Sequence, residues 1–170
     1  CDLFVMMDFD DIGSYKIKDE NIIKAVKFLF SRDKNGAVFA NQLGTYYDMW
    51  TLRDKKYCEN DFWVEIFQFL IRNKNLSEQI SKDNFIEVKK KIIDKKTFSF
   101  NVNMPPILVD SAFGGLGIYK MKNILNNKKK YKGTQNIEVT SKDQKKVKLK
   151  YQKCEHVNFN LGIVEQNLDL

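Results

Sequence analysis

The chain has 170 residues and a formal net charge of +7, with 29 Lys and Arg residues against 22 Asp and Glu residues. Hydrophobic residues make up 43% of the chain and aromatic residues 13%. This composition excludes a largely disordered protein and is sufficient for a buried core. No apolar run approaches the roughly 20 residues that cross a bilayer. We expect a single domain that spans residues 1–170.

The three cysteines, Cys1, Cys58 and Cys154, are scattered along the chain and form no CxxC pair. This distribution predicts free thiols in a reducing, cytoplasmic compartment, rather than a disulfide framework or a zinc site. The chain begins without Met and inside an apolar stretch, which indicates a fragment of a longer protein.

Lysines occur in short clusters, such as Lys89–Lys91 and Lys128–Lys130. The simplest interpretation is a solvated surface, and the alternative is attraction to the phosphates of anionic lipids or nucleic acid. The chain contains three arginines (Arg32, Arg53 and Arg72). Because base recognition relies on arginine forks, we expect no nucleic-acid partner, whereas peripheral contact with a membrane stays an alternative.

The first predicted elements are a strand and a helix. Residues 3–7 form a continuous apolar run, which is typical of a strand buried on both faces in a parallel sheet. Residues 19–31 show the apolar spacing of a helix, with Asp19 or Asn21 as the expected N-cap.

A second strand and a second helix follow. The Asn35-Gly36 pair predicts a turn before a short buried strand at residues 37–40. Asp61 is expected to cap a helix whose apolar side chains fall within residues 62–71.

The second half of the chain is less regular. Residues 85–93 have a weak helical pattern, and residues 107–120 contain a strand interrupted by glycines. We expect residues 126–150 to be a basic loop with one strand at 137–139, and residues 154–164 to form a last helix or turn. The early alternation of strands and helices predicts the α/β class.

An acidic cluster, Asp8, Asp10 and Asp11, directly follows the first predicted strand. Open α/β sheets bind ligands at the carboxyl ends of their strands. Two carboxylates at this spacing can share a Mg²⁺ or Mn²⁺ ion that bridges phosphate oxygens. The alternative is a group of acids that merely caps the end of the strand.

Two further segments combine residue types that suit a ligand site. In residues 46–53, aromatic rings could stack on a sugar while Asp48 binds hydroxyls, with Trp50 and Arg53 beside it. On composition alone, a core segment with a buried Asp–Arg pair is favoured. Residues 110–117 contain three glycines, which indicate close approach of a ligand or another strand, or else a bulge in an edge strand.

The chain has one histidine, His156, which follows Glu155. A single histidine is more often a structural or surface group than a ligand. Glu155 could act as a general base if a cleft raised its pKa toward neutrality.

Four segments, taken in order, resemble one family. They are MDFDD at 7–11, YYDMWTLR at 46–53, DSAFGGLGIYK at 110–120 and CEHVNFN at 154–160. Together they resemble GT-A type glycosyltransferases, in particular a group akin to capsule mannosyltransferases that occurs in large viruses, bacteria and fungi. The resemblance implies a Rossmann-like mixed sheet flanked by helices. It also implies that a nucleotide-binding half precedes this chain, which is then the metal- and acceptor-binding portion.

The resemblance implies transfer of a sugar from a UDP- or GDP-linked donor to a hydroxyl of a glycan or lipid-linked acceptor. It implies Mn²⁺ or Mg²⁺ held by Asp8 and Asp10, with His156 as a further ligand. The expected donor- and acceptor-binding residues are Asp48, Trp50, Arg53, Ser111, Gly114 and Gly115.

Glu155 is the expected base for the acceptor hydroxyl, with Asp110 or Asp48 in reserve. Two other functions fit parts of the pattern. A HAD-type phosphatase would use Asp8 as nucleophile and Asp10 as acid and base, but it needs a later strand that ends in an acidic pair. A non-enzymatic basic module would bind anionic partners through the lysine clusters.

Overall fold

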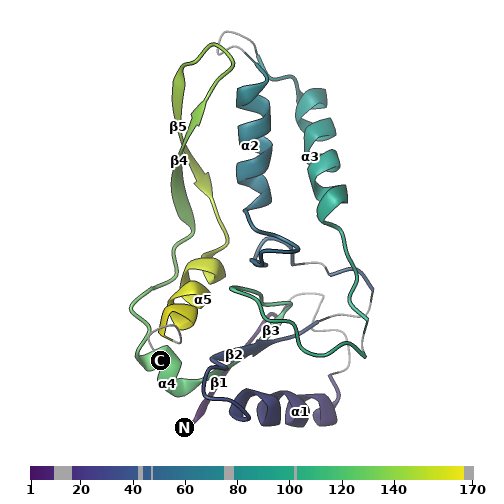
Figure 1. Ribbon diagram of the computed structural model, residues 1–170, viewed down its shortest axis with the longest axis vertical. Helices are drawn as coiled ribbons and strands as arrows, with labels where there is room; N and C mark the ends of the chain where they lie inside the picture. The colour runs from purple at the N-terminus through teal and green to yellow at the C-terminus, as the bar shows by residue number, and fades with distance from the viewer. Residues whose placement is uncertain (10–16, 42–43, 47, 75–78, 102, 167–170) are drawn as a thin grey trace.

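The computed structural model describes residues 1–9, 17–41, 44–46, 48–74, 79–101 and 103–166. These residues form a mixed α/β structure with five helices and two small antiparallel sheets (Figure 1). In chain order, the elements are β1 (Leu3–Met7), α1 (Asp19–Phe30), β2 (Ala37–Phe39), α2 (Phe62–Arg72), α3 (Lys82–Lys96), β3 (Leu116–Lys120), α4 (Met121–Leu125), β4 (Thr134–Thr140), β5 (Lys146–Gln152) and α5 (Glu155–Gln166).

The larger sheet has the strand order β1-β3-β2, and β3 is antiparallel to both neighbours. Ile118 of β3 therefore pairs with Val5 on one side and with Val38 on the other. The prediction of a parallel sheet with β1 buried on both faces is wrong. In the described structure β1 is an edge strand, and Val5 is 56% exposed because α1 packs against β2 and β3 instead.

Tyr119 is the centre of the core on the α5 face of the sheet. Its side chain is fully buried and contacts the rings of Phe4, Phe39 and Phe159 at centroid distances of 6.1, 5.6 and 5.9 Å. Successive side chains of a strand point to opposite faces, so the buried Ile118 points to the other face, against which α1 lies (Figure 1). The sheet is thus held between α1 and α5.

The predicted helices are confirmed, but the predicted N-cap of α1 is not. α1 begins after Lys18, which makes no side-chain cap, so the expected caps Asp19 and Asn21 are wrong. Asp19 instead lies in the first turn, where a negative charge interacts favourably with the helix dipole. Asp61 caps α2 as predicted, because its carboxylate accepts a hydrogen bond from the Trp63 N–H at 2.9 Å.

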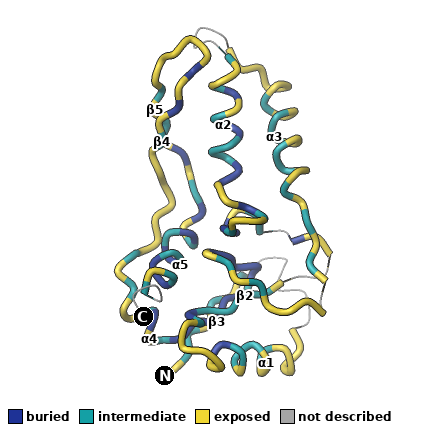
Figure 2. The backbone as a smooth tube through the Cα atoms, in the orientation of Figure 1, coloured by how far each residue is buried: buried dark blue, intermediate teal, exposed yellow. Residues whose placement is uncertain are grey.

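α2 and α3 lie side by side and extend away from the larger sheet, with the β4–β5 hairpin along the other side of α2 (Figure 1). The buried side chains of α2, Phe62, Ile66 and Leu70, form a separate core with apolar side chains of α3. α3 itself has no buried residue in the described structure, as Figure 2 shows, so it covers α2 from one side. None of the described helices combines the length and apolar character that a membrane crossing requires.

The predicted strand at 137–139 is confirmed within β4, but the prediction of a loop around it is wrong, because residues 134–152 form the β4–β5 hairpin. The two strands pair from Thr134 with Gln152 to Thr140 with Lys146. In β5 the apolar side chains alternate with lysines. The composition of this segment is therefore polar, and only the alternation with a period of two indicates a strand. Its apolar half lies inward, where Tyr151 is buried.

Candidate functional site

The four segments that carry the resemblance meet around the start of β3. The Asp8 N–H donates a hydrogen bond to the Gly115 carbonyl at 3.0 Å. The Asp48 carboxylate accepts one from the Gly114 N–H at 3.2 Å. α5 joins the same region, because the Cys154 thiol, which directly precedes it, lies 3.2 Å from the Thr51 hydroxyl. Asp8, Asp48, Gly114 and Gly115 are therefore brought together, with the N-terminus of α5 alongside.

Gly114 and Gly115 form a turn that enters the central strand. Both have positive φ angles, +63° and +80°. A Cβ atom on Gly114 would lie 2.2 Å from the Ala40 carbonyl oxygen, and the Ala40 N–H donates to the Leu116 carbonyl at 2.8 Å. The prediction of close approach by another strand is confirmed at Gly114, because Ala40 directly follows β2. The alternative of a bulge in an edge strand is wrong, because β3 is central.

Asp48 is a half-buried carboxylate that bonds to two parts of the chain. One oxygen accepts hydrogen bonds from the Thr51 hydroxyl (2.7 Å) and the Thr51 N–H (3.3 Å), and the other accepts from Gly114. Burial raises the pKa of Asp48, and these hydrogen bonds oppose that effect without reversing it. The position of this carboxylate is thus fixed from both sides.

The imidazole of His156 lies between two aromatic rings. It stacks on Phe113 with a centroid distance of 4.3 Å and an interplanar angle of 15°, and Tyr131 meets it edge-on at 5.3 Å. The Tyr131 hydroxyl lies 3.4 Å from His156 Nδ1 and also donates to the sulfur of Met6 in β1 at 3.1 Å. These contacts fix the ring close to the end of β1.

Glu155 and His156 occupy the first turn of α5 with different exposure. The Glu155 side chain is 48% exposed and the His156 side chain 14%, with Oε1 and Nε2 at 3.9 Å. Glu155 therefore presents its carboxylate to solvent, and His156 packs against the protein.

Asn160 is a buried residue that the sequence analysis missed. Its side-chain oxygen accepts a hydrogen bond from the Tyr119 hydroxyl at 3.2 Å. Its amide nitrogen donates to the Ser111 hydroxyl (3.0 Å) and the Ala112 carbonyl (2.9 Å). The available signal was its spacing of four residues from His156, which places both side chains on one face of α5. Tyr131, the aromatic residue within a run of lysines, was missed in the same way.

Two of the expected binding residues lie in the interior. The Arg53 guanidinium is 2.8 Å from the Asp61 carboxylate and also donates to the carbonyls of Trp50 and Leu52. The favoured alternative, a core segment with a buried Asp–Arg pair, describes Arg53 correctly, although its partner is Asp61. Ser111 is completely buried, and its hydroxyl accepts the hydrogen bond from Asn160.

Trp50 and Asp110 remain at the surface. Trp50 is 36% exposed, and its carbonyl is one of the acceptors for Arg53. Asp110 is also exposed, and its N–H donates to the Arg53 carbonyl at 2.8 Å. Both residues therefore border the buried Arg53 with their side chains open to solvent.

A divalent cation at this site remains a prediction. Asp10 and Asp11 lie outside the described residues. Among the residues that the structure does describe, no group of three or more acid, histidine or cysteine side chains is placed to hold a metal ion. Asp8 through its backbone N–H and Asp48 through its carboxylate nevertheless bond to adjacent residues of one turn. Carboxylate oxygens are the hard donors that Mg²⁺ and Mn²⁺ prefer.

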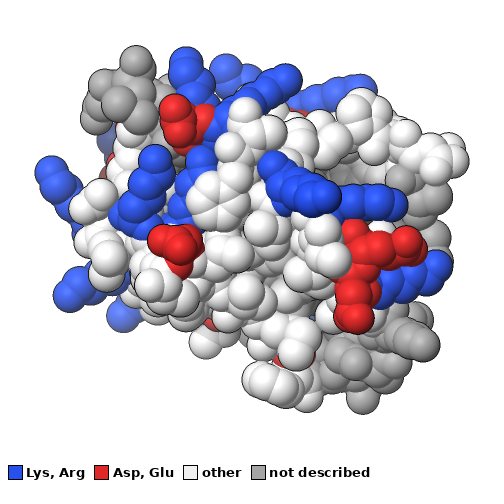
Figure 3. Space-filling model, turned by 90° about the horizontal axis from the view of Figure 1, so that it is seen from below, with Lys and Arg blue, Asp and Glu red and all other residues white. Residues whose placement is uncertain are grey.

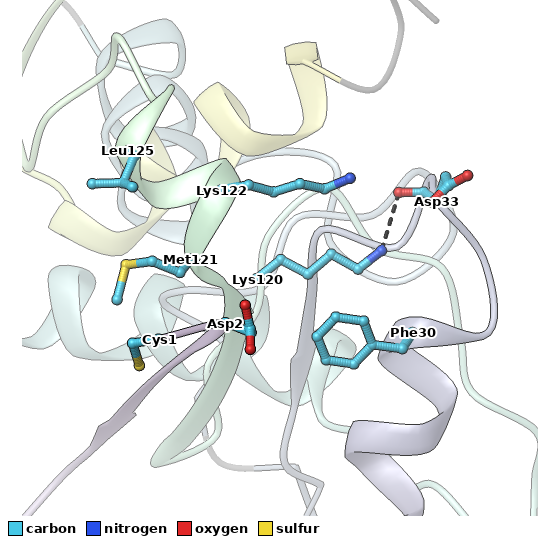
Figure 4. A pocket seen from close by; sticks show the side chains of 8 residues that line it. All are labelled: Cys1, Asp2, Phe30, Asp33, Lys120, Met121, Lys122 and Leu125. Atoms are coloured by element: carbon cyan, nitrogen blue, oxygen red, sulfur yellow. Dashed lines mark hydrogen bonds between the residues drawn. The ribbon is translucent and has the colours of Figure 1, made fainter.

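Two surface pockets lie away from this site. The larger, about 340 Å³, is bordered by the start of β1, the end of α1 and the start of α4 (Figure 4). The Lys120 amine extends along it beside the Phe30 ring and donates to the carbonyls of Arg32 and Asp33 at 2.9 and 3.2 Å. These bonds tie Lys120 to the end of α1. A second pocket, about 220 Å³, lies between α2 and α3.

The strands described after residue 61 bear on the phosphatase alternative. β3 ends at Lys120, β4 at Thr140 and β5 at Gln152, and none of these described strands ends in an acidic pair.

Comparison of the chain with protein-family models finds no match, and comparisons with curated proteins and with solved structures find none either.

Proposed function

We propose that this chain belongs to a metal-dependent glycosyltransferase of the GT-A type, which transfers a sugar from a nucleoside diphosphate to a hydroxyl of a glycan or lipid-linked acceptor. The observation that supports this most is the convergence of the four resembling segments. They are far apart in the sequence, and they are joined by hydrogen bonds from Asp8 to Gly115, from Gly114 to Asp48 and from Asn160 to Ser111.

The donor side of the proposed site is the turn beside β1. Asp8, together with Asp10, would hold Mn²⁺ or Mg²⁺, which neutralises the negative charge that builds on the departing nucleoside diphosphate. Gly115 has no side chain, so a sugar can approach its backbone closely, whereas the space beside Gly114 is filled by the Ala40 carbonyl. Asp48 holds the Gly114 N–H in a fixed direction through its 3.2 Å hydrogen bond.

The acceptor side is the first turn of α5. Glu155 is the proposed base because its carboxylate is exposed in the first turn of α5, where an acceptor hydroxyl can reach it. A base at this position removes the proton from the acceptor hydroxyl if the configuration of the sugar inverts. Asp48 is less suited to this task, since its oxygens already accept hydrogen bonds from Thr51 and Gly114.

The test is calorimetric titration of the intact protein with UDP- and GDP-sugars, with and without Mn²⁺. We expect binding of one donor that depends on the cation and is lost in Asp8→Asn. Loss of one such carboxylate should also slow sugar transfer, because it should raise the activation barrier by about 3–4 kcal/mol, by analogy with loss of an oxyanion-hole donor.

Asp2→Asn is the matched control, because Asp2 directly precedes β1 at its opposite end and is exposed. This variant should bind the donor as the unmodified protein does. Absence of binding to every donor in a well-folded intact protein would refute the proposal. Trapping of a phosphate-mimicking fluoride at Asp8 would indicate a phosphatase instead.

A further inference from the structure

The positive charge of this protein is concentrated in one segment. Residues 126–153 contain ten lysines and two acidic residues, a formal charge of +8, whereas the whole chain carries +7. Elsewhere the charges are mixed: the face at the α1 end shows both basic and acidic side chains (Figure 3). The segment comprises the loop after α4, the β4–β5 hairpin and the approach to α5.

The outer face of the hairpin presents a row of lysines. Lys146, Lys148 and Lys150 are exposed and alternate along β5, so their side chains leave one face at intervals of about 7 Å. The opposite face packs toward α2, with Val139 and Tyr151 buried. One salt bridge, from Lys146 to Glu138 at 2.9 Å, offsets part of this charge.

The loop after α4 adds apolar groups to the same side of the molecule. In Figure 1 this loop continues below the hairpin, along the same flank. It carries exposed Lys128, Lys130 and Lys132, with Tyr131 43% exposed and the neighbouring Leu125 77% exposed. Lysines together with an exposed aliphatic and an aromatic side chain are typical of segments that lie at a membrane–water interface.

We propose that the outer face of the hairpin, the loop of residues 126–132 and Leu125 at the end of α4 form a docking surface for an anionic phospholipid bilayer. The charge complementarity is direct, since lysines near an anionic leaflet are attracted to it without a defined geometry. Residues 126–153 contain no arginine, and the bidentate forks that favour nucleic-acid phosphates and bases are therefore missing from this segment. The exposed Leu125 is also better suited to a lipid than to a nucleic-acid surface.

This surface is connected to the candidate site. Tyr131 contacts His156 through its hydroxyl, and β5 ends two residues before Cys154, which precedes α5. Docking through this flank would hold Glu155 and His156 close to the bilayer. That consequence rests on the proposed function, in which it favours a lipid-linked acceptor, whereas membrane binding itself does not depend on it.

The experiment is cosedimentation of the intact protein with phosphatidylcholine vesicles, with and without phosphatidylglycerol. We expect binding to the anionic vesicles that weakens as salt is added. Each lysine close to an anionic surface strengthens binding about fivefold (about 1 kcal/mol), so Lys146→Gln, Lys148→Gln and Lys150→Gln combined should weaken it about a hundredfold.

A second triple variant, Lys90→Gln, Lys91→Gln and Lys95→Gln on α3, makes the same charge change on another element and should weaken binding much less. Leu125→Ser should weaken binding about tenfold through lost apolar contact. Circular dichroism checks that each variant is folded, and the salt dependence of the unmodified protein supports or contradicts the proposal without any variant.

Three results would overturn the inference. Equal binding to neutral and anionic vesicles would contradict the electrostatic contribution. Equal losses in the two triple variants would show that only the net charge matters. Binding of duplex RNA or DNA that is tighter than vesicle binding at physiological salt, and is lost in the hairpin variant, would assign the surface to nucleic acid. None of these readouts uses sugar transfer, so failure here and failure of the proposed function are distinguishable.

Discussion

The carboxylate of Asp48 accepts a hydrogen bond from the backbone N–H of Gly114 at 3.2 Å, across 66 residues of sequence. Gly115, the next residue, bonds through its carbonyl to the N–H of Asp8. Two acids from separate segments are therefore fixed to consecutive residues of one turn. Stability of this turn is the condition for any chemistry that the site performs.

Gly114→Ala should destabilise the protein by about 2–4 kcal/mol, since alanine is strained at φ +63° and its Cβ would lie 2.2 Å from the Ala40 oxygen. Urea unfolding measures this change. Gly44→Ala is the control, with φ +89° but nothing within 4 Å of the added atom. The free energy of unfolding of this control should fall by about 1 kcal/mol. Equal losses in the two variants would contradict the close approach of Ala40.

The pKa of Asp48 predicts a pH dependence of stability. Burial raises this pKa, so the folded state binds the proton more tightly than the unfolded state, and stability falls as pH rises through the folded pKa. Relative to Asp48→Asn, the free energy of unfolding of the unmodified protein should therefore increase as pH falls from 7 toward the ordinary pKa near 3.8. A difference that shrinks over this range would show that the hydrogen bonds from Thr51 and Gly114 outweigh burial.

The buried ion pair between Arg53 and Asp61 predicts a large coupling. Asp61→Ala removes the α2 cap and the partner of a buried guanidinium, and it should destabilise the protein by about 3–5 kcal/mol. Combining it with Arg53→Met should cost less than the sum of the single changes, as a double-mutant cycle in urea measures. Additive losses would argue against the pair.

An exposed ion pair provides the control for this cycle. Lys145 pairs with Asp143 at the surface, and exposed pairs contribute little to stability. Lys145→Ala removes this pair but keeps the hydrogen bond from Ser141 to Asp143, so it should leave the urea midpoint nearly unchanged.

Asn160 predicts a contrast within one helix. Asn160→Ala leaves the buried hydroxyls of Tyr119 and Ser111 without this partner, and it should cost about 2–4 kcal/mol. Asn158→Ala, at the surface of the same helix, removes one exposed hydrogen bond to the Lys130 carbonyl and should cost about 0.5–1 kcal/mol. Thermal unfolding compares the two, and similar losses would show that the Asn160 network contributes little.

The helices could be predicted because their signals are local. Asp61 before an apolar helical face identifies α2, and the spacing of Ile22, Val26 and Leu29 identifies α1. The direction of the strands could not be predicted in this way. Pairing of Val5 with Ile118 joins residues more than a hundred positions apart, and an apolar run has the same composition in a parallel or an antiparallel sheet.

The candidate site shows the same limit. The sequence identifies Asp48, Gly114 and Gly115 as unusual residues. It does not predict the hydrogen bond between the Asp48 carboxylate and the Gly114 N–H, because 66 residues separate them. Arg53 has the residue type of a ligand contact, yet burial against Asp61 decides its role. The residue type of Asn160 predicts a surface position, since asparagine is mostly exposed, and only its spacing from His156 indicated otherwise.

The order of the strands determines when the larger sheet can assemble. β3 forms every strand pair of that sheet, yet it follows both its neighbours in the chain. While the ribosome synthesises residues 40–115, β1 and β2 have no partner strand, and Phe4 and Phe39 cannot yet pack on Tyr119. Pairings of such long separation form slowly. We therefore expect nascent chains that end before residue 120 to bind chaperones and to be sensitive to proteases, and chains that extend well beyond it to become protected.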